Sequence, residues 1–184
     1  MTTTLTLANA INVTRDLEQR LVGLVLPNQP RPRVAYACYS IAREHHAASL
    51  LLLAREQPSY ATAFALLRPT LEASLRGDWI AACASEEDVK TFALGGKKQL
   101  DISSLVKALQ LKSNATDMHD VIYKNLWSVV SAYTHTYEHQ VQHWLAFEPP
   151  IPNYSPEQIG WLLNASTACL AVCVSSTVRL ARAT

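Results

Sequence analysis

The chain has 184 residues, 49% of them hydrophobic, and its 16 Lys and Arg nearly balance 15 Asp and Glu, leaving a formal net charge of +1. This composition excludes an intrinsically disordered protein, which needs low hydrophobicity or high net charge. It also excludes a nucleic-acid binder that relies on a strongly basic surface. At this length we expect one domain over residues 1–184, with residues 1–4 flexible.

Glycine is scarce, with five residues in the whole chain, and all-β proteins need many turn glycines, so the composition favours helices. The N-terminal residues lack the basic start and apolar run of a signal peptide, and we therefore expect a cytoplasmic protein. The apolar stretch Ile159–Val174 is shorter than the roughly 20 residues of a membrane span and contains polar side chains. We interpret it as a core helix and expect no membrane association.

Apolar periodicity predicts a series of helices along the chain. The first covers Leu5–Leu26. The second, over Val34–Arg55, is apolar around most of its circumference and is therefore expected to be central and buried. A third helix, over Tyr60–Ala84, contains Pro69, which removes one backbone hydrogen bond, and we predict a kinked helix rather than two helices.

Capping signals mark the helices that follow. Short helices are expected at Glu86–Leu94 and from Asp101 to about Lys112, and the longest helix from Thr116 or Asp117 to about Phe147. The last helix begins at Ser155-Pro156-Glu157-Gln158, which combines a Ser cap, a proline at the first helical position and a Gln for a capping box, and it runs to about Arg182. The prediction is an all-α, single-domain bundle of four long helices plus an N-terminal helix and two short helices.

Charged residues line one flank of the third predicted helix. Arg68, Glu72 and Arg76 repeat every four residues and therefore share one side of the helix, with Trp79 between Arg68 and Glu72 in angle. Arg68 lies at the edge of the apolar stripe, and a partly buried guanidinium needs a partner, for which Glu72 is the nearest candidate. Two interpretations stay open: a structural ion pair between helices, or an Arg/Glu pair that faces a phosphate or carboxylate site.

A row of histidines, His135, His139 and His143, follows one side of the longest predicted helix. Two histidines at i and i+4 can bind one divalent ion, so a metal at His135 and His139 is one interpretation. The apolar face, which includes Tyr133, points away from most of the row, and this favours solvated or interface histidines. In a third interpretation His135 is a catalytic or substrate-contacting residue.

A polar run, Arg43-Glu44-His45-His46, interrupts the second predicted helix. Its polar atoms either face a pocket between helices or extend along an edge of the bundle to solvent. The second arrangement is the commoner one for long polar side chains.

Two segments of the chain carry a resemblance: Arg68-Pro69-Thr70-Leu71-Glu72 and Ser131-Ala132-Tyr133-Thr134-His135. They resemble a family of uncharacterised bacterial helical proteins that is similar in turn to HEPN-like domains, which include the abortive-infection protein AbiV. The resemblance covers roughly Val34–Arg182 and implies an all-helical bundle, often dimeric, in the bacterial cytoplasm. Active HEPN-type ribonucleases carry an Arg shortly before the catalytic His on one helix, and here no Arg precedes His135 in that way.

We therefore expect a non-catalytic regulatory or interaction protein in a bacterial stress or defence system, which forms a homodimer or binds a protein partner and needs no cofactor. One alternative is a HEPN-like, metal-independent ribonuclease that acts on RNA with His135, Arg68 and Glu72. A second alternative is a metal-binding protein that holds a divalent ion at His135 and His139. The further residues expected to contact a ligand are Arg76, Tyr133 and Trp79.

Overall fold

A computed structural model of the chain describes residues 5–96, 100–134, 138–145, 147–149 and 151–182, with the backbone alone at 138–139. Residues 1–4, which the sequence predicts to be flexible, lie outside this set. The described residues form helices and no strand, which confirms the all-α prediction. The elements in chain order are α1 (Leu7–Gln19), α2 (Pro30–Leu53), α3 (Tyr60–Ala65), α4 (Leu67–Ala82), α5 (Glu86–Ala93), α6 (Ile102–Ser113), the π-helical segment η1 (His119–Trp127), α7 (Ser128–Thr134), α8 (Glu138–Gln142) and α9 (Pro156–Arg182).

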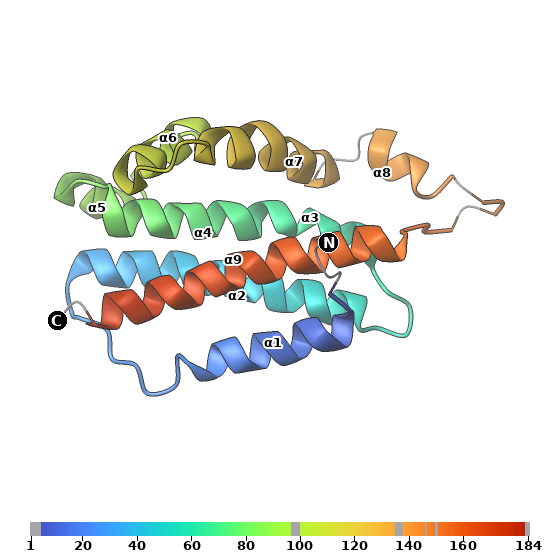
Figure 1. The fold of residues 1–184 in the computed structure, drawn as a ribbon, viewed down its shortest axis with the longest axis horizontal. Coiled ribbons are helices and arrows are strands. Elements are labelled where there is room, and N and C mark those ends of the chain that lie inside the picture. Colours follow the sequence, from blue (N-terminus) through green and yellow to red (C-terminus); the bar gives the residue numbers. More distant parts are fainter. Residues whose placement is uncertain (1–4, 97–99, 135–137, 146, 150, 183–184) are drawn as a thin grey trace.

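The bundle has α4 between two groups of helices (Figure 1). On one side, α6, η1 and α7 form a layer over α4. On the other side, α2 packs along the length of α4, α9 crosses both of them, and α1 covers α9 and α2. Helix α4 therefore contributes side chains to both sides of the molecule, and its residues line two separate hollows described below.

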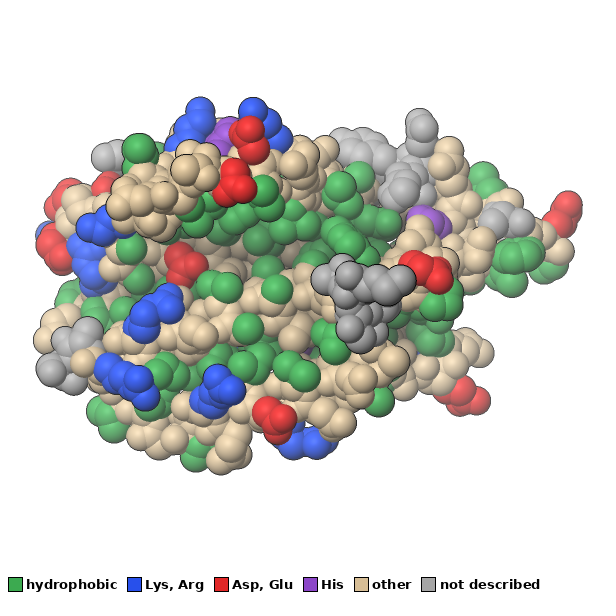
Figure 2. Space-filling view, viewed as in Figure 1, with side chains coloured by type: hydrophobic (Ala, Val, Ile, Leu, Met, Phe, Trp, Pro, Cys, Tyr) green, Lys and Arg blue, Asp and Glu red, His purple; other side chains and the backbone are tan. Residues whose placement is uncertain are grey.

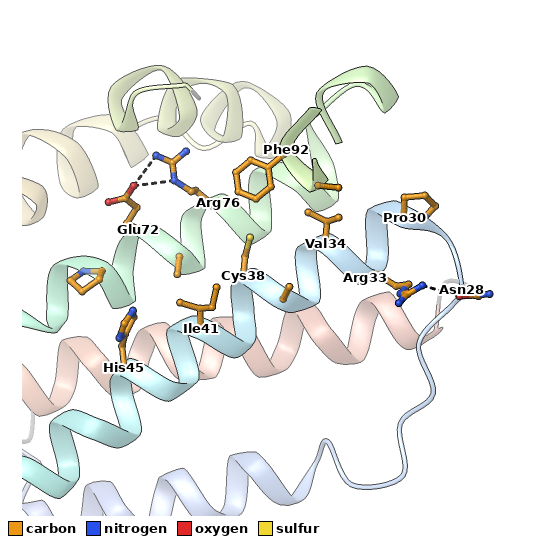
Figure 3. A pocket seen from close by; sticks show the side chains of 14 residues that line it. Asn28, Pro30, Arg33, Val34, Cys38, Ile41, His45, Glu72, Arg76 and Phe92 are labelled. Atoms are coloured by element: carbon orange, nitrogen blue, oxygen red, sulfur yellow. Dashed lines mark hydrogen bonds and ion pairs between the residues drawn. The ribbon is translucent and has the colours of Figure 1, made fainter. Parts of the chain in front are cut away.

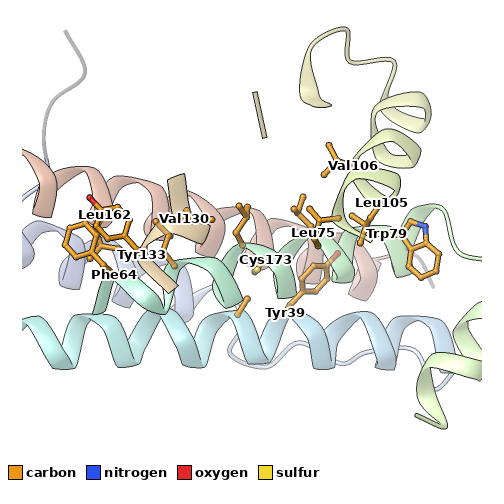
Figure 4. Close-up of a cluster of buried hydrophobic side chains, with 14 of the residues drawn as sticks. Tyr39, Phe64, Leu75, Trp79, Leu105, Val106, Val130, Tyr133, Leu162 and Cys173 are labelled. Carbon is orange, nitrogen blue, oxygen red and sulfur yellow. The ribbon is translucent and has the colours of Figure 1, made fainter. Parts of the chain in front are cut away.

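The core runs the length of the bundle and is formed by apolar side chains from every long helix (Figure 4). Tyr39 of α2, Leu75 of α4 and Cys173 of α9 meet in one half, and Phe64 of α3 and Leu162 of α9 lie in the other. Each fully buried side chain of this size contributes about 1.5–3 kcal/mol through removal of apolar surface from water. The core therefore fixes α2, α4 and α9 relative to one another.

The predicted helix boundaries need correction in the first half of the chain. Helix α1 ends at Gln19 rather than Leu26, because the chain turns through Gly23, whose φ is +79°. Helix α2 begins at Pro30 rather than Val34, since a proline fits the first turn, where no backbone N–H is needed. The single kinked helix predicted around Pro69 is two helices, α3 and α4, which meet at Leu66.

The longest predicted helix, up to Phe147, is also wrong. Its first part is the continuous pair η1 and α7, described up to Thr134, and α8 ends at Gln142, before Phe147. By contrast, the capping signals at Asp101 and Ser155 are confirmed, whereas η1 begins at His119 after Met118 and has no side-chain cap from Thr116 or Asp117. Asp101 accepts a hydrogen bond from the Ser104 N–H at 2.9 Å, and the Ser155 hydroxyl caps α9.

Helix α9 is the one helix among the described residues that is long and apolar enough to cross a membrane by length and composition. Its 27 residues exceed the apolar stretch Ile159–Val174 on which the sequence-based argument rested. Of its most apolar window, 56% is buried against the rest of the fold. A mostly buried core helix passes the same test, so this feature is weak evidence for a membrane span.

Candidate functional site

Helices α2 and α4 frame an open groove of about 740 Å³ on one side of the bundle (Figure 3). We call it the α2/α4 groove. Its apolar lining comes from three helices, and its polar lining is confined to a few side chains near its ends and edge. The apolar residues include Val34, Cys38, Ile41, Ala73 and Phe92, and the charged or titratable residues are Arg33, His45, Glu72 and Arg76.

An ion pair within α4 forms the polar edge of the groove. Nε and Nη2 of Arg76 both donate to Oε1 of Glu72, at 3.0 and 2.7 Å, and both side chains are at least half-buried. Nη1 of Arg76 also donates to the Leu100 carbonyl at 3.4 Å. The Arg76 guanidinium is therefore held at three of its donor positions, in a fixed orientation beside the groove.

The predicted pairing of Arg68 with Glu72 is wrong, because Glu72 pairs with Arg76. Both pairs have i, i+4 spacing, but an acid that precedes a base along a helix is favoured over the reverse order. The guanidinium of Arg68 instead lies over the ring of Trp127 in η1, with Cζ 4.8 Å from the ring centroid. Arg68 does not line the α2/α4 groove, and it connects α4 to η1.

Two further predicted ligand contacts, Trp79 and Tyr133, belong to the core. Both side chains are buried, and the Tyr133 ring lies 4.6 Å from the ring of Phe64. Burial raises the pKa of the Tyr133 phenol above its usual value, so this group stays protonated. Of the residues predicted to form a site, Glu72 and Arg76 line the groove, whereas Trp79 and Tyr133 do not.

The histidine row falls largely outside the described residues. These exclude His135 and the side chain of His139, so the predicted metal pair and the predicted catalytic histidine stay predictions. His143 is described: its Nδ1 donates to the Asn153 carbonyl at 2.8 Å, and its ring stacks on Tyr154 at 4.4 Å between centroids. Within the described part of the chain, no group of three or more His, Cys, Asp or Glu side chains is placed to hold a metal ion.

The sequence leaves open whether His46 faces the inside of the bundle or solvent, and in the structure it is a buried polar centre. Its Nε2 lies 2.8 Å from the Thr14 hydroxyl of α1, and its Nδ1 lies 2.5 Å from the Ser166 hydroxyl of α9. The Thr14 hydroxyl donates to the Ala10 carbonyl, so it accepts from Nε2–H, and Nδ1 accepts from Ser166. Burial lowers the pKa of His46 to about 4, and the imidazole is therefore neutral near pH 7.

The sequence does contain a signal for this burial. The buried positions of α2 include Ala35, Tyr39, Ala42, His46 and Ser49, which alternate by four and three residues. That alternation marks one face of a helix, and it places His46 on the core side while its neighbour His45 lines the groove.

A family model described as "Family of unknown function (DUF6988)" matches residues 39–183. The chain belongs to this family. The matched region contains α3 to α9 and most of α2, whereas α1 and Arg33 precede it. No curated protein and no solved structure matches the chain. The family description assigns no function, so the resemblance to HEPN-like domains stays a prediction.

Proposed function

We propose that this protein is a non-catalytic interaction protein that binds a helical surface through the α2/α4 groove, and that its first partner is a second copy of itself. The observation that carries the proposal is that α2 exposes large apolar side chains, one of which, Ile41, lines the groove. Ile41 is 49% exposed and Leu51 is 71% exposed, although the other faces of α2 pack against α1, α4, α5 and α9. A large apolar side chain exposed beside an apolar groove is typical of a protein–protein contact surface.

The charges on α2 favour a second copy over an unrelated partner. Arg33 and Glu44 are exposed and lie on either side of Ala37 and Ile41. If two α2 helices pack nearly antiparallel with Ala37 of one copy against Ile41 of the other, Arg33 faces Glu44 and His45 of the second copy. A two-fold axis repeats this contact, so the same surface is complementary to itself. Opposite charges at such positions set register and partner choice.

The groove is suited to packing. The exposed residue Ala37 lets a partner helix approach α2 closely, and Ala73 of α4 keeps the groove open beside it. Glu72 and Arg76 neutralise each other and form a fixed polar edge, which suits a role in positioning a partner. The cytoplasmic location is supported by four cysteines that are all free. The stress or defence setting rests on the resemblance alone.

The test is the oligomeric state of the purified full chain, measured by sedimentation velocity across a concentration series. We expect a reversible dimer for the wild type and a monomer for Ile41→Asp. Leu111→Asp on α6 is the matched control, because it also places a carboxylate at an exposed aliphatic side chain and should leave the dimer intact. A wild-type monomer at every concentration would overturn the proposal.

The antiparallel register has its own test. Arg33→Glu places a carboxylate opposite Glu44 of the second copy and should weaken the dimer by about tenfold or more. The double variant Arg33→Glu/Glu44→Arg restores an attractive pair and should recover most of that loss, because the two effects are coupled. Additive losses in the double variant would rule out this register.

A further inference from the structure

A second hollow, of about 770 Å³, lies on the other side of α4, between α4, α6, η1 and α9. We call it the α4/α9 cleft. Hydrophobic side chains follow the hollow between α9 and the upper layer of helices (Figure 2). Its volume falls within the roughly 300–1,000 Å³ that small-molecule pockets occupy. This cleft shares no lining residue with the α2/α4 groove and is independent of the proposed dimer.

The two long walls of the cleft are apolar, and the open space of the cleft separates them. Ile122 and Leu126 of η1 and Met118, which directly precedes η1, recur at four-residue intervals and line the cleft, and no residue of η1 is buried. On the opposite wall, α9 contributes exposed residues that include Ala168 and Val172. Helix η1 packs chiefly on α6 and α7, whereas α9 packs on α1, α2 and α4. Both walls therefore keep apolar surface that a ligand would remove from water.

One carboxylate, Asp78 of α4, projects into this apolar cleft. Its Oδ1 accepts hydrogen bonds from the Tyr39 hydroxyl at 2.7 Å and from the Ser176 hydroxyl at 2.8 Å. Tyr39 and Ser176 are both buried, so they fix the orientation of the carboxylate. Burial and the negative charge of Asp78 raise the pKa of Tyr39, which therefore remains a donor to Asp78.

Oδ2 is the second oxygen of the Asp78 carboxylate. Among the residues that the structure describes, no group donates a hydrogen bond to Oδ2. The guanidinium of Arg179 is close by, but its Nη2 donates to the Ser176 hydroxyl at 2.6 Å rather than to the carboxylate. Both cations that line the cleft, Lys112 and Arg179, are exposed at its rim. The charge that lies deeper in the cleft is thus a carboxylate whose Oδ2 accepts a hydrogen bond from none of the described residues.

We propose that the α4/α9 cleft binds a small hydrophobic amine, whose protonated nitrogen donates to Oδ2 of Asp78 and whose apolar body lies between η1 and α9. An ammonium supplies the donor and the positive charge that the carboxylate lacks, and a charge-assisted hydrogen bond in an apolar surrounding is stronger than a neutral one. An apolar pocket with a single oriented polar anchor is the usual design of a small-molecule site.

The two cations at the rim of the cleft allow the charge of the ligand to be tested through changes in binding affinity. Lys112 and Arg179 repel a bound ammonium weakly, because they are exposed and screened by solvent. Removal of the Arg179 charge should therefore strengthen amine binding by a few-fold, while removal of the Asp78 charge should weaken it strongly. A carboxylate ligand would respond in the opposite direction at both positions.

The experiment compares n-octylamine, n-octanol and n-octanoate, which have the same chain and different head groups, by isothermal titration calorimetry on the full chain. We expect n-octylamine to bind tightest. Asp78→Asn should weaken n-octylamine by about tenfold or more and change n-octanol by less than about twofold. An asparagine oxygen still accepts from Tyr39 and Ser176. Tightest binding of n-octanoate, equal binding of all three, or no binding would each overturn the proposal.

Two further variants keep the test decisive if Asp78→Asn fails to fold. Ala168→Trp starts from an exposed alanine on the α9 wall and fills the cleft, so it should abolish n-octylamine binding without disturbing the core. Arg179→Gln should increase the affinity for n-octylamine. Unchanged binding in Ala168→Trp would place the amine elsewhere, and weaker binding in Arg179→Gln would contradict the role of charge.

Discussion

Nδ1 of His46 on α2 lies 2.5 Å from the Ser166 hydroxyl on α9, and this buried hydrogen bond joins residues 120 positions apart in the sequence. The other ring nitrogen contacts Thr14, so one neutral imidazole holds α1, α2 and α9 together. A protonated ring would carry two N–H donors, and Nδ1 would then lose the hydrogen bond that it accepts from Ser166. The packing of the three helices is thus coupled to the charge of His46.

This coupling predicts a loss of stability in mild acid. The pKa of His46 is about 4 in the folded chain and about 6.5 when unfolded, so the unfolded chain binds more protons between these values. The free energy of unfolding should fall as pH drops from 6.5 towards 4, by up to about 3 kcal/mol. Urea denaturation at a series of pH values measures it. His46→Gln should be less stable at pH 7 and should lack most of this pH dependence; an equal slope in both proteins would contradict the assignment.

Gly77 of α4 lies directly against the ring of Tyr39 of α2, and a larger residue cannot fit at this position. A Cβ at position 77 would lie 2.4 Å from Cε1 of Tyr39, whose ring is fully buried and hydrogen-bonded to Asp78. We expect Gly77→Ala to destabilise the fold by about 3 kcal/mol, measured by urea denaturation. In the double variant with Tyr39→Leu the loss should be smaller than the sum of the two single losses. A neutral Gly77→Ala would show that α2 and α4 can separate at low cost.

Local signals in the sequence predicted much of the fold. The capping residues before α6 and α9 act through neighbours three positions away, so the pattern alone identifies them. The end of α1 was misplaced because residues 20–26 continue the apolar spacing after the helix has stopped. Near Pro69 the axis is interrupted at Leu66, which places the proline in the first turn of α4, where backbone N–H groups have no intrahelical acceptor.

The candidate sites depend on contacts between distant segments, which the sequence pattern does not contain. The sequence pattern does not identify Asp78 as a site residue, because its partners, Tyr39 and Ser176, lie on two other helices. Arg68 was assigned to Glu72 from spacing, whereas its ring contact, Trp127, comes from a different layer of the bundle. Spacing identified the flank of α4 that carries Glu72 and Arg76, and tertiary packing determined which of its residues reach the groove.

The ribonuclease alternative is tested with His135→Ala. Wild-type protein and the variant are purified in parallel and incubated with total RNA, and the products are compared on a denaturing gel. Because we propose a non-catalytic protein, we expect the same RNA pattern with both. RNA cleavage by the wild type that is absent from His135→Ala would show that His135 acts on RNA and would contradict the proposal.

The metal alternative is tested by elemental analysis of untagged protein. We expect zinc and nickel well below one ion per chain, because two neighbouring histidines bind a stray ion weakly without further ligands. His139→Ala serves as the comparison, and it should leave the metal content and thermal stability unchanged. One equivalent of metal in the wild type, lost in His139→Ala, would establish the His135/His139 site.

The capping box of α9 predicts a measurable contribution to stability. The Ser155 N–H donates to the Gln158 side-chain oxygen at 2.8 Å, and the Gln158 N–H donates to the Ser155 hydroxyl at 3.3 Å. Ser155→Ala removes the cap and should lower the free energy of unfolding by about 1 kcal/mol. Ser85→Ala removes the equivalent cap of α5. Among the described helices, α5 makes substantial contact with α2 only. Because α9 packs on three helices, we expect the global denaturant midpoint to fall more for Ser155→Ala than for Ser85→Ala. The reverse order would mean that the start of α9 is not part of the cooperative core.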